Sequence, residues 1–292
     1  MNPEQPLHTP RLLSQLQDWL AEDLGRGDLT APAVSGRRAQ ASWITKQDGL
    51  FCGGGLAVQL FRMLDPELEA ECLVADGAAV HSGDTLLRLD GQASALVGAE
   101  RTALNLAMRL SGIATATAEL VAELQGSGVR LADTRKTTPG LRELEKYAVR
   151  LGGGVNHRLG LDDAAMLKEN HLAWAGGVVP AMAAVRACAP WPARVIVEAE
   201  TEEEAAAAVS AGADGVLLDE FTPEQLISLV PRLRQLAVER NVPGVLVLEV
   251  SGIQPTDLRT FAATGIDLIS TSAPVTRSRW LDLSMRFTPA GR

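Results

Sequence analysis

Residues 133–171 read DTRKTTPGLRELEKYAVRLGGGVNHRLGLDDAAMLKENH. They open at the end of one strand-like apolar run, 129–133, and close just after another, 164–168, with a helical pattern between them. The stretch gathers cationic and imidazole side chains, although the chain has only 4 His and a formal net charge of -9. This set comprises Arg135, Lys136, Arg142, Lys146, Arg150, His157, Arg158, Lys168 and His171. Such a concentration in an acidic protein predicts a binding site for an anion.

The composition is that of a soluble globular protein. Over 292 residues, 46% are hydrophobic and 22% are charged. This length fits one large domain or two ordinary ones. The negative net charge argues against a general nucleic-acid-binding protein, which would present a basic face.

The cysteines and the ends of the chain bear on location. Cys52, Cys72 and Cys188 are odd in number and widely separated, with no CxxC pair. We therefore expect reduced thiols in the core of a cytoplasmic protein, and neither a disulfide framework nor a zinc site. The N-terminus, MNPEQPLHTP, lacks the basic and apolar segments of a signal peptide. No apolar stretch approaches 18 residues, so we expect no membrane span.

The first third of the chain mixes helical and strand patterns. Apolar spacing predicts helices at 11–24, 54–64, 94–111 and 114–125, and the first domain is expected to end near Gly112. Alternation and turn dipeptides predict a strand at 39–46 and an antiparallel sheet within 68–90. We interpret this part as a domain of strands packed with helices.

After residue 113, apolar runs rich in β-branched residues recur, and helical patterns separate most of them. These runs predict strands at 129–133, 164–168, 194–199, 215–219, 245–250 and 267–271. Repeated βα units with apolar strands indicate an α/β fold with a parallel sheet, here a barrel or near-barrel. In such barrels, functional residues collect at the carboxyl ends of the strands. All six predicted strands end on polar or charged residues, which favours a site at that edge.

The expected rim has two electrostatic halves. Arg135, Lys136 and Lys168, with His157 and Arg158 on a loop between them, would bind carboxylates or phosphates. Glu198 and Asp219, with Glu249 as a further candidate, would suit Mg²⁺, which takes hard oxygen ligands and bridges to substrate phosphates.

Other charges in the region have a simpler interpretation. Arg142, Glu143, Glu145 and Lys146 lie on a predicted helix, where pairing at i,i+4 on a solvated face is expected. Glu202, Glu203 and Glu204 fit the first turn of a helix, so we exclude them from the metal set.

The 133–171 stretch resembles the signature region of the quinolinate phosphoribosyltransferase family. The similarity extends over nearly the whole chain. It includes EDLGRGDLT at 22–30, GLFCG at 49–53, ERTALNLAMRLSGIAT at 100–115, AGADGVLLDEF at 211–221, LEVSGI at 248–253 and LDLSMRF at 281–287.

The resemblance implies a type II phosphoribosyltransferase fold. An N-terminal open α/β sandwich, residues 1–113, would be joined by the C-terminal segment 274–292. An incomplete seven-stranded parallel α/β barrel would span 114–273. The family implies a pentosyltransferase that converts quinolinate and phosphoribosyl pyrophosphate, with Mg²⁺, into nicotinate mononucleotide, pyrophosphate and CO₂. It also implies a homodimer, or a dimer-based hexamer, with shared active sites.

The family's functional residues are carried over by position. Arg135, His157, Arg158 and Lys168 would hold the two quinolinate carboxylates, with Lys136 beside them and Arg101 reaching in from a neighbouring subunit. Glu198 and Asp219 would serve Mg²⁺ and the ribose hydroxyls, and Ser251 and Gly252 would bind phosphate. Lys136, Lys168, Glu198 and Asp219 form the expected catalytic set. The chain departs from the family's V-G-A-L-T segment with Thr271-Ser272-Ala273-Pro274-Val275, so Ser272 adds a side chain at the expected phosphate site.

Three alternatives stay open at this point. One is a related phosphoribosyltransferase with another acceptor, as in the paralogue found with molybdate-transport genes. A second is a Schiff-base aldolase that uses Lys168. A third is a non-catalytic scaffold, for which the rim charges would have no use.

Overall fold

The computed structural model describes residues 9–240, 244 and 246–288. Contacts divide the chain into two compact units, Met1–Ala116 with Ser278–Arg292, and Thr117–Arg277. The boundaries expected from the sequence, after residues 113 and 273, fall close to these. The first residue of the strand expected at 245–250 lies outside the described residues.

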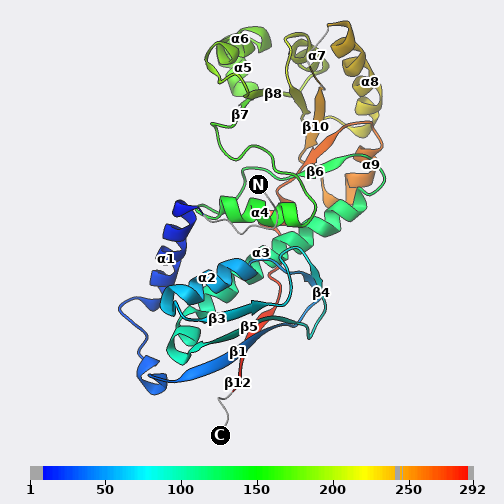
Figure 1. Cartoon of the computed structure of the whole chain (residues 1–292). Helices are drawn as coiled ribbons and strands as arrows, with labels where there is room; N and C mark the ends of the chain where they lie inside the picture. The colour runs from blue at the N-terminus through cyan, green and yellow to red at the C-terminus, as the bar shows by residue number, and fades with distance from the viewer. Residues whose placement is uncertain (1–8, 241–243, 245, 289–292) are drawn as a thin grey trace. The chain divides into compact units, whose positions relative to one another are not determined.

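The first unit is built on an antiparallel sheet with strand order β12-β1-β5-β3. The last strand of the chain pairs with the first, Ala41 lying opposite Phe287, as the family resemblance implied (Figure 1). Trp43 and Phe61 pack edge to face in its core, with ring centroids 6.2 Å apart. Its elements are α1 (Pro10–Leu24), η1 (Ala31–Val34), β1 (Arg38–Thr45), β2 (Gly49–Leu50), α2 (Gly54–Leu64), β3 (Glu69–Cys72), β4 (Ala79–Val80), β5 (Thr85–Gln92), most of α3 (Ala93–Glu123) and β12 (Leu283–Thr288).

Helix α3 corrects one expectation. The sequence predicted two helices with a break near Gly112, but the structure has one helix of 31 residues. Gly112 lies inside this helix, at a point where the segment around Arg279 passes so close that a side chain would not fit. A Cβ atom built at this position would lie 2.0 Å from the carbonyl oxygen of Arg279. The glycine therefore marks a backbone approach rather than a helix end.

The second unit is a six-stranded parallel sheet with strand order β6-β11-β10-β9-β8-β7, which confirms the α/β fold class and all six predicted strands. The resemblance implied seven strands, whereas the described residues form six, with an isolated parallel bridge that joins Ala132 to Val155 beyond β6. The strands are β6 (Arg130–Ala132), β7 (Ala164–Leu167), β8 (Arg194–Ala199), β9 (Gly215–Leu218), β10 (Val247–Ser251) and β11 (Leu268–Ser270). The helices are α4 (Arg142–Leu151), α5 (Glu169–Ala175), α6 (Val178–Cys188), α7 (Glu202–Ser210), α8 (Pro223–Glu239), η2 (Pro255–Asp257), α9 (Leu258–Ala262) and α10 (Ala273–Thr276).

Side-chain burial explains why this sheet forms. Val195, Val197, Val216, Leu248 and Ile269 are all essentially inaccessible to solvent, and alanine-rich helices pack against them. Parallel sheets need such cover on their faces, which accounts for the nearly continuous apolar runs in the sequence. This core leaves the polar residues at the strand ends to form a site.

Two further sequence expectations concern single features. Among the described residues, no helix is both long enough and apolar enough to cross a membrane. All three cysteines are free, but only Cys52 is buried, whereas Cys72 and Cys188 are exposed. The expectation of core thiols is therefore correct for Cys52 alone.

Candidate active site

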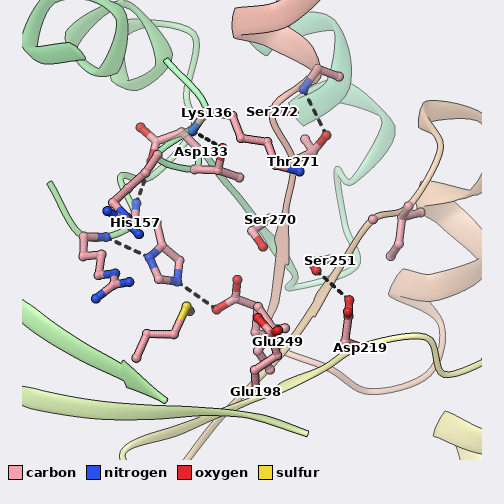
Figure 2. Close-up of a pocket in the computed structure, with 18 of the residues that line it drawn as sticks. Asp133, Lys136, His157, Glu198, Asp219, Glu249, Ser251, Ser270, Thr271 and Ser272 are labelled. Atoms are coloured by element: carbon pink, nitrogen blue, oxygen red, sulfur yellow. Dashed lines mark hydrogen bonds and ion pairs between the residues drawn. The ribbon is translucent and has the colours of Figure 1, made fainter. Parts of the chain in front are cut away.

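A pocket of about 870 Å³ lies at the carboxyl ends of the strands of the second unit. Side chains at or just after the carboxyl ends of β6, β7, β8, β9, β10 and β11 line it (Figure 2). Of the residues assigned from the sequence, it gathers Arg135, Lys136, His157, Arg158, Lys168, Glu198, Asp219, Ser251, Gly252 and Ser272. The sequence thus predicted a set of residues that the fold brings together.

Arg101 is the exception. It lies on α3 within the first unit, is exposed, and does not line this pocket. Its expected role requires a second subunit, so the single chain leaves that role as a prediction.

A buried ion pair supports the cationic half of the pocket. Lys146 on α4 pairs with Asp133 at the end of β6, and each side chain is only 1% exposed. The same carboxylate accepts hydrogen bonds from Asn156 Nδ2 at 2.7 Å and from the backbone N–H of His157 at 2.8 Å. Lys146 also donates to the carbonyl oxygen of His157 at 3.0 Å. This network fixes the 156–158 segment beside the pocket.

The burial of Lys146 and Glu145 contradicts the solvated helix face expected from the sequence. Glu145 accepts hydrogen bonds from the backbone N–H and the hydroxyl of Thr138, both at 2.8 Å. Thr138 lies just beyond Arg135 and Lys136, so this carboxylate holds the turn that carries them. The two charges point inward because α4 packs its polar residues onto the loops that build the pocket.

His157 is fixed through both ring nitrogens. Nδ1 lies 2.9 Å from the backbone N–H of Arg158, which can only donate, so Nδ1 is the accepting nitrogen. Nε2 lies 3.2 Å from Oε2 of Glu249 and carries the ring hydrogen toward that carboxylate. In this arrangement His157 positions neighbouring groups, and the cationic half of the pocket rests on arginine and lysine.

Arg135 and Arg158 bring two guanidinium groups into the same pocket, which favours the binding of an anion. Arg158 donates to the carbonyl oxygen of Ala164 at 3.0 Å, which leaves other N–H groups of the fork for a ligand. Burial lowers the pKa of Arg158, and the nearby charge of Arg135 lowers it further. A carboxylate bound beside both side chains would relieve that repulsion.

The acidic half contains Glu198 and Asp219. Glu198 forms an ion pair with Lys168, which is 41% exposed, whereas the carboxylate is 10% exposed. Burial raises the pKa of Glu198, Lys168 opposes that rise, and the nearby charge of Asp219 reinforces it. Oδ1 of Asp219 accepts a hydrogen bond from the Ser251 hydroxyl at 3.0 Å. This hydrogen bond joins Ser251, which is expected to bind phosphate, to Asp219, which is expected to bind the metal ion.

The carboxylates alone do not enclose a metal ion. Within the described part of the chain, no group of three or more His, Cys, Asp or Glu side chains could hold one. Glu198 and Asp219 are two hard oxygen donors in a pocket that is also lined by arginine and lysine side chains. Mg²⁺ typically uses one or two protein carboxylates together with substrate phosphates, and this donor set fits that pattern.

The pocket also contains residues that the sequence argument did not assign. Ser270 ends β11 on the pocket floor, and Arg277 follows α10 with Nη1 3.4 Å from Oε1 of Gln254. Ser270 lies within a strand whose polar end had been noted, so that signal could have found it. Arg277 lies beyond β11, the last strand of the second unit, where only the three-dimensional structure returns it to the pocket. At the same edge, Ala273 N–H donates to the hydroxyl of Thr271 at 3.1 Å.

Two domain models of one protein family match this chain. The family model described as "Quinolinate phosphoribosyl transferase, N-terminal domain" matches residues 28–111. The corresponding C-terminal domain model matches residues 113–286. Together these matches span most of the chain.

Individual relatives agree with the family match. A Synechocystis protein described as "Probable nicotinate-nucleotide pyrophosphorylase [carboxylating]" is 42% identical over 273 residues, which is 93% of this chain and 90% of that protein. The nicotinate-nucleotide pyrophosphorylase (carboxylating) of Mycobacterium leprae is 38% identical over 278 residues, covering 91% of this chain and 93% of that protein. The structure of the nicotinate-nucleotide pyrophosphorylase from Francisella tularensis superposes with a TM-score of 0.88 at 34% identity, covering 99% of each chain.

Proposed function

The chain belongs to the quinolinate phosphoribosyl transferase family, and from that membership we propose that it makes nicotinate mononucleotide. It transfers the phosphoribosyl group of phosphoribosyl pyrophosphate to quinolinate and releases pyrophosphate and CO₂, a step of NAD biosynthesis. The observation that carries this proposal is the pocket at the strand ends, with cations on one side and carboxylates on the other. A dianionic acceptor and a phosphorylated sugar with a metal ion match these two sides.

The cationic side binds quinolinate. Arg135 and Arg158 place two guanidinium groups beside the pocket, and each can hold a carboxylate through two parallel hydrogen bonds. Lys136 and Lys168 add ammonium groups, and His157 keeps the Arg158 backbone in place. Arg101 of a second subunit completes the clamp in a homodimer, which is the assembly we propose.

The acidic side binds the sugar and a metal ion. Glu198 and Asp219 accept hydrogen bonds from ribose hydroxyls and supply two carboxylate ligands to Mg²⁺, while Ser251, Gly252 and Ser272 bind phosphate. When bound, Mg²⁺ supplies charge neutralisation to the departing pyrophosphate. Lys168 bridges the two sides because its ammonium group already pairs with Glu198.

The chemistry needs orientation more than covalent catalysis. The bond between C1 of the ribose and the pyrophosphate oxygen breaks, and the electron pair leaves with pyrophosphate. The pyridine nitrogen attacks C1, and Glu198 and Asp219 favour the positive charge that develops on the sugar. The pyridinium then accepts the electrons of the breaking C2–carboxylate bond as CO₂ departs, and C2 takes a proton from the Lys136 ammonium group or water. Holding two mutually repelling anions in register supplies much of the rate.

The central test is CO₂ release from carboxyl-labelled quinolinate, with and without phosphoribosyl pyrophosphate. We expect release only when both substrates are present. Arg135→Ala and Lys168→Ala should nearly abolish it while circular dichroism stays unchanged. Arg232→Ala serves as a matched control because this arginine is exposed and pairs with Glu202 outside the pocket. Faster turnover of another acceptor would instead assign the chain to a related phosphoribosyltransferase.

The shared site and the metal have separate tests. Arg101→Ala subunits mixed with Arg135→Ala subunits should regain part of the activity, because a hybrid dimer would contain one intact site. No recovery would contradict the shared site. A Glu198→Ala/Asp219→Ala variant should lose its response to Mg²⁺, and an unchanged metal titration would contradict the metal assignment.

A further inference from the structure

Glu249 is a carboxylate of the pocket that the mechanism above does not use. It lies on β10, lines the pocket, and its side chain is only 4% exposed. Oε2 lies 3.2 Å from Nε2 of His157, whose other ring nitrogen is held by the Arg158 backbone. One carboxylate oxygen is therefore fixed, and the direction of the other is fixed with it.

The second oxygen of this carboxylate is unsatisfied. Oε1 is buried and has no hydrogen-bond partner. Figure 2 shows the Glu249 carboxylate directed into the space between His157 and Ser270. A buried oxygen without a donor is unfavourable, and for a charged group the cost is larger still. A ligand that brings a donor to this point would remove that cost.

The proposed substrates differ in what they can donate. At neutral pH quinolinate offers carboxylates and a ring nitrogen, all of which are acceptors, and the phosphate and pyrophosphate groups are chiefly acceptors as well. Among the groups of the substrates, only the ribose hydroxyls can donate to Oε1, and the remaining donors are water molecules, free or bound to a metal ion. Mg²⁺ is already assigned to Glu198 and Asp219, and among the described residues no group of three or more His, Cys, Asp or Glu side chains would hold a second cation at Glu249. A sugar hydroxyl is thus the donor that the site can hold in place.

We propose that Glu249 is a further substrate-binding residue, whose Oε1 accepts a hydrogen bond from a hydroxyl of the phosphoribosyl group. The proposal rests on the proposed function and deepens it. Glu249 joins the two halves of the site, since one oxygen orients His157 beside the acceptor clamp and the other holds the sugar. This contact comes in addition to the hydroxyl contacts of Glu198 and Asp219.

The test compares sugar phosphates that differ by one hydroxyl. Ribose 5-phosphate, 2-deoxyribose 5-phosphate and 3-deoxyribose 5-phosphate are titrated calorimetrically into the full-length protein at fixed Mg²⁺, without quinolinate. The variants are Glu249→Ala and the isosteric Glu249→Gln, with Glu224→Ala as a control at an exposed glutamate on α8. ¹⁵N chemical shifts of the imidazole report whether His157 keeps its hydrogen on Nε2.

We expect Glu249→Ala to reduce the preference for ribose 5-phosphate over one of the two deoxy sugars by about tenfold or more, the effect of losing a hydrogen bond to a charged group. Glu249→Gln should reduce it less, because the amide still hydrogen-bonds to a hydroxyl, and Glu224→Ala should leave it unchanged. Equal weakening of all three sugars would overturn the proposal and make Glu249 a positioning residue for His157. An effect that disappears without Mg²⁺ would also overturn it.

The proposed reaction is assayed separately on the same preparation. If the wild-type protein releases no CO₂ from quinolinate, the proposed function fails whatever the sugar titrations show. If it does release CO₂ and the sugar preference survives in both Glu249 variants, only the present proposal fails.

Discussion

Replacing Lys146 by methionine should destabilise the protein by about 3 kcal/mol, at the lower end of the range for breaking a buried ion pair. Methionine fills the space of the apolar stem but removes the ammonium group that pairs with Asp133. The carboxylate would stay buried without its counter-ion. It keeps hydrogen bonds from Asn156 and from the His157 backbone, which is why the lower end applies.

The penalty should depend on pH in a definite direction. Burial raises the pKa of Asp133 above its ordinary value, and Lys146 opposes that rise. Removing Lys146 therefore raises this pKa further. A carboxyl group with a raised folded-state pKa contributes stability that is complete below its unfolded pKa of about 3.9 and is lost as the pH rises through the folded value. The cost of Lys146→Met should thus be largest at neutral pH and should shrink as the solution is acidified.

Urea unfolding followed by circular dichroism at several pH values measures this cost, with both units followed when they unfold separately. Arg232→Met is the matched control, because its ion pair with Glu202 is exposed and should be worth less than about 1 kcal/mol. Adding Asp133→Asn to Lys146→Met should recover part of the loss at neutral pH. A Lys146→Met cost as small as that of the control, or one independent of pH, would refute the reasoning.

Three further outcomes are expected. Gly112→Ala should cost several kcal/mol in urea unfolding, because its Cβ would meet the carbonyl oxygen of Arg279 at 2.0 Å. Cys52 should resist alkylation at pH 8 until the chain unfolds, because burial raises the pKa of its thiol well above the usual value, whereas Cys188 should label in the native protein. Burial also raises the pKa of Glu198, so Glu198→Gln should gain stability relative to the wild-type protein as the pH rises from about 4.

Each of these three predictions has a control within the same protein. Gly98→Ala lies in the same helix, and its Cβ would meet only the ends of leucine side chains at 3.1 Å or more, so a cost equal to that of Gly112→Ala would remove the steric explanation. Partial burial also raises the pKa of Cys72, so its labelling should accelerate more steeply with pH than an unhindered model thiol. A Glu198→Gln difference that stays flat with pH would show that this carboxyl group is not perturbed.

Much of the fold followed from local patterns. The β-branched apolar runs predicted six strands of a parallel sheet, because strands covered on both faces leave a strong signal. The polar residues at their ends then predicted the pocket, since the ends of parallel strands meet at one edge of the sheet. Arg135, Lys168 and Asp219 come from distant parts of the chain, and the strand order alone brings them together.

The predictions from the sequence were wrong where a residue's environment depends on a partner that is distant in the sequence. Lys146 carried the pattern of a surface helix, and nothing local indicates that Asp133 receives its ammonium group. The break predicted between 111 and 114 was wrong, because the segment that requires a glycine at position 112 lies far along the sequence, at Arg279. The unpaired oxygen of Glu249 was equally invisible, since it depends on the ring orientation of His157.

Because β1 pairs with β12, the sheet of the first unit cannot be completed until β12 has been translated. Residues 38–45 emerge early, but their partner at 283–288 is translated more than two hundred residues later. The second unit has its whole sequence available first and can fold while the first sheet still lacks an edge strand. During that interval β1 exposes unpaired backbone groups that invite pairing with other chains. Deletion of residues 283–288 should therefore cause aggregation by way of the N-terminal sheet, although it removes no residue that lines the pocket.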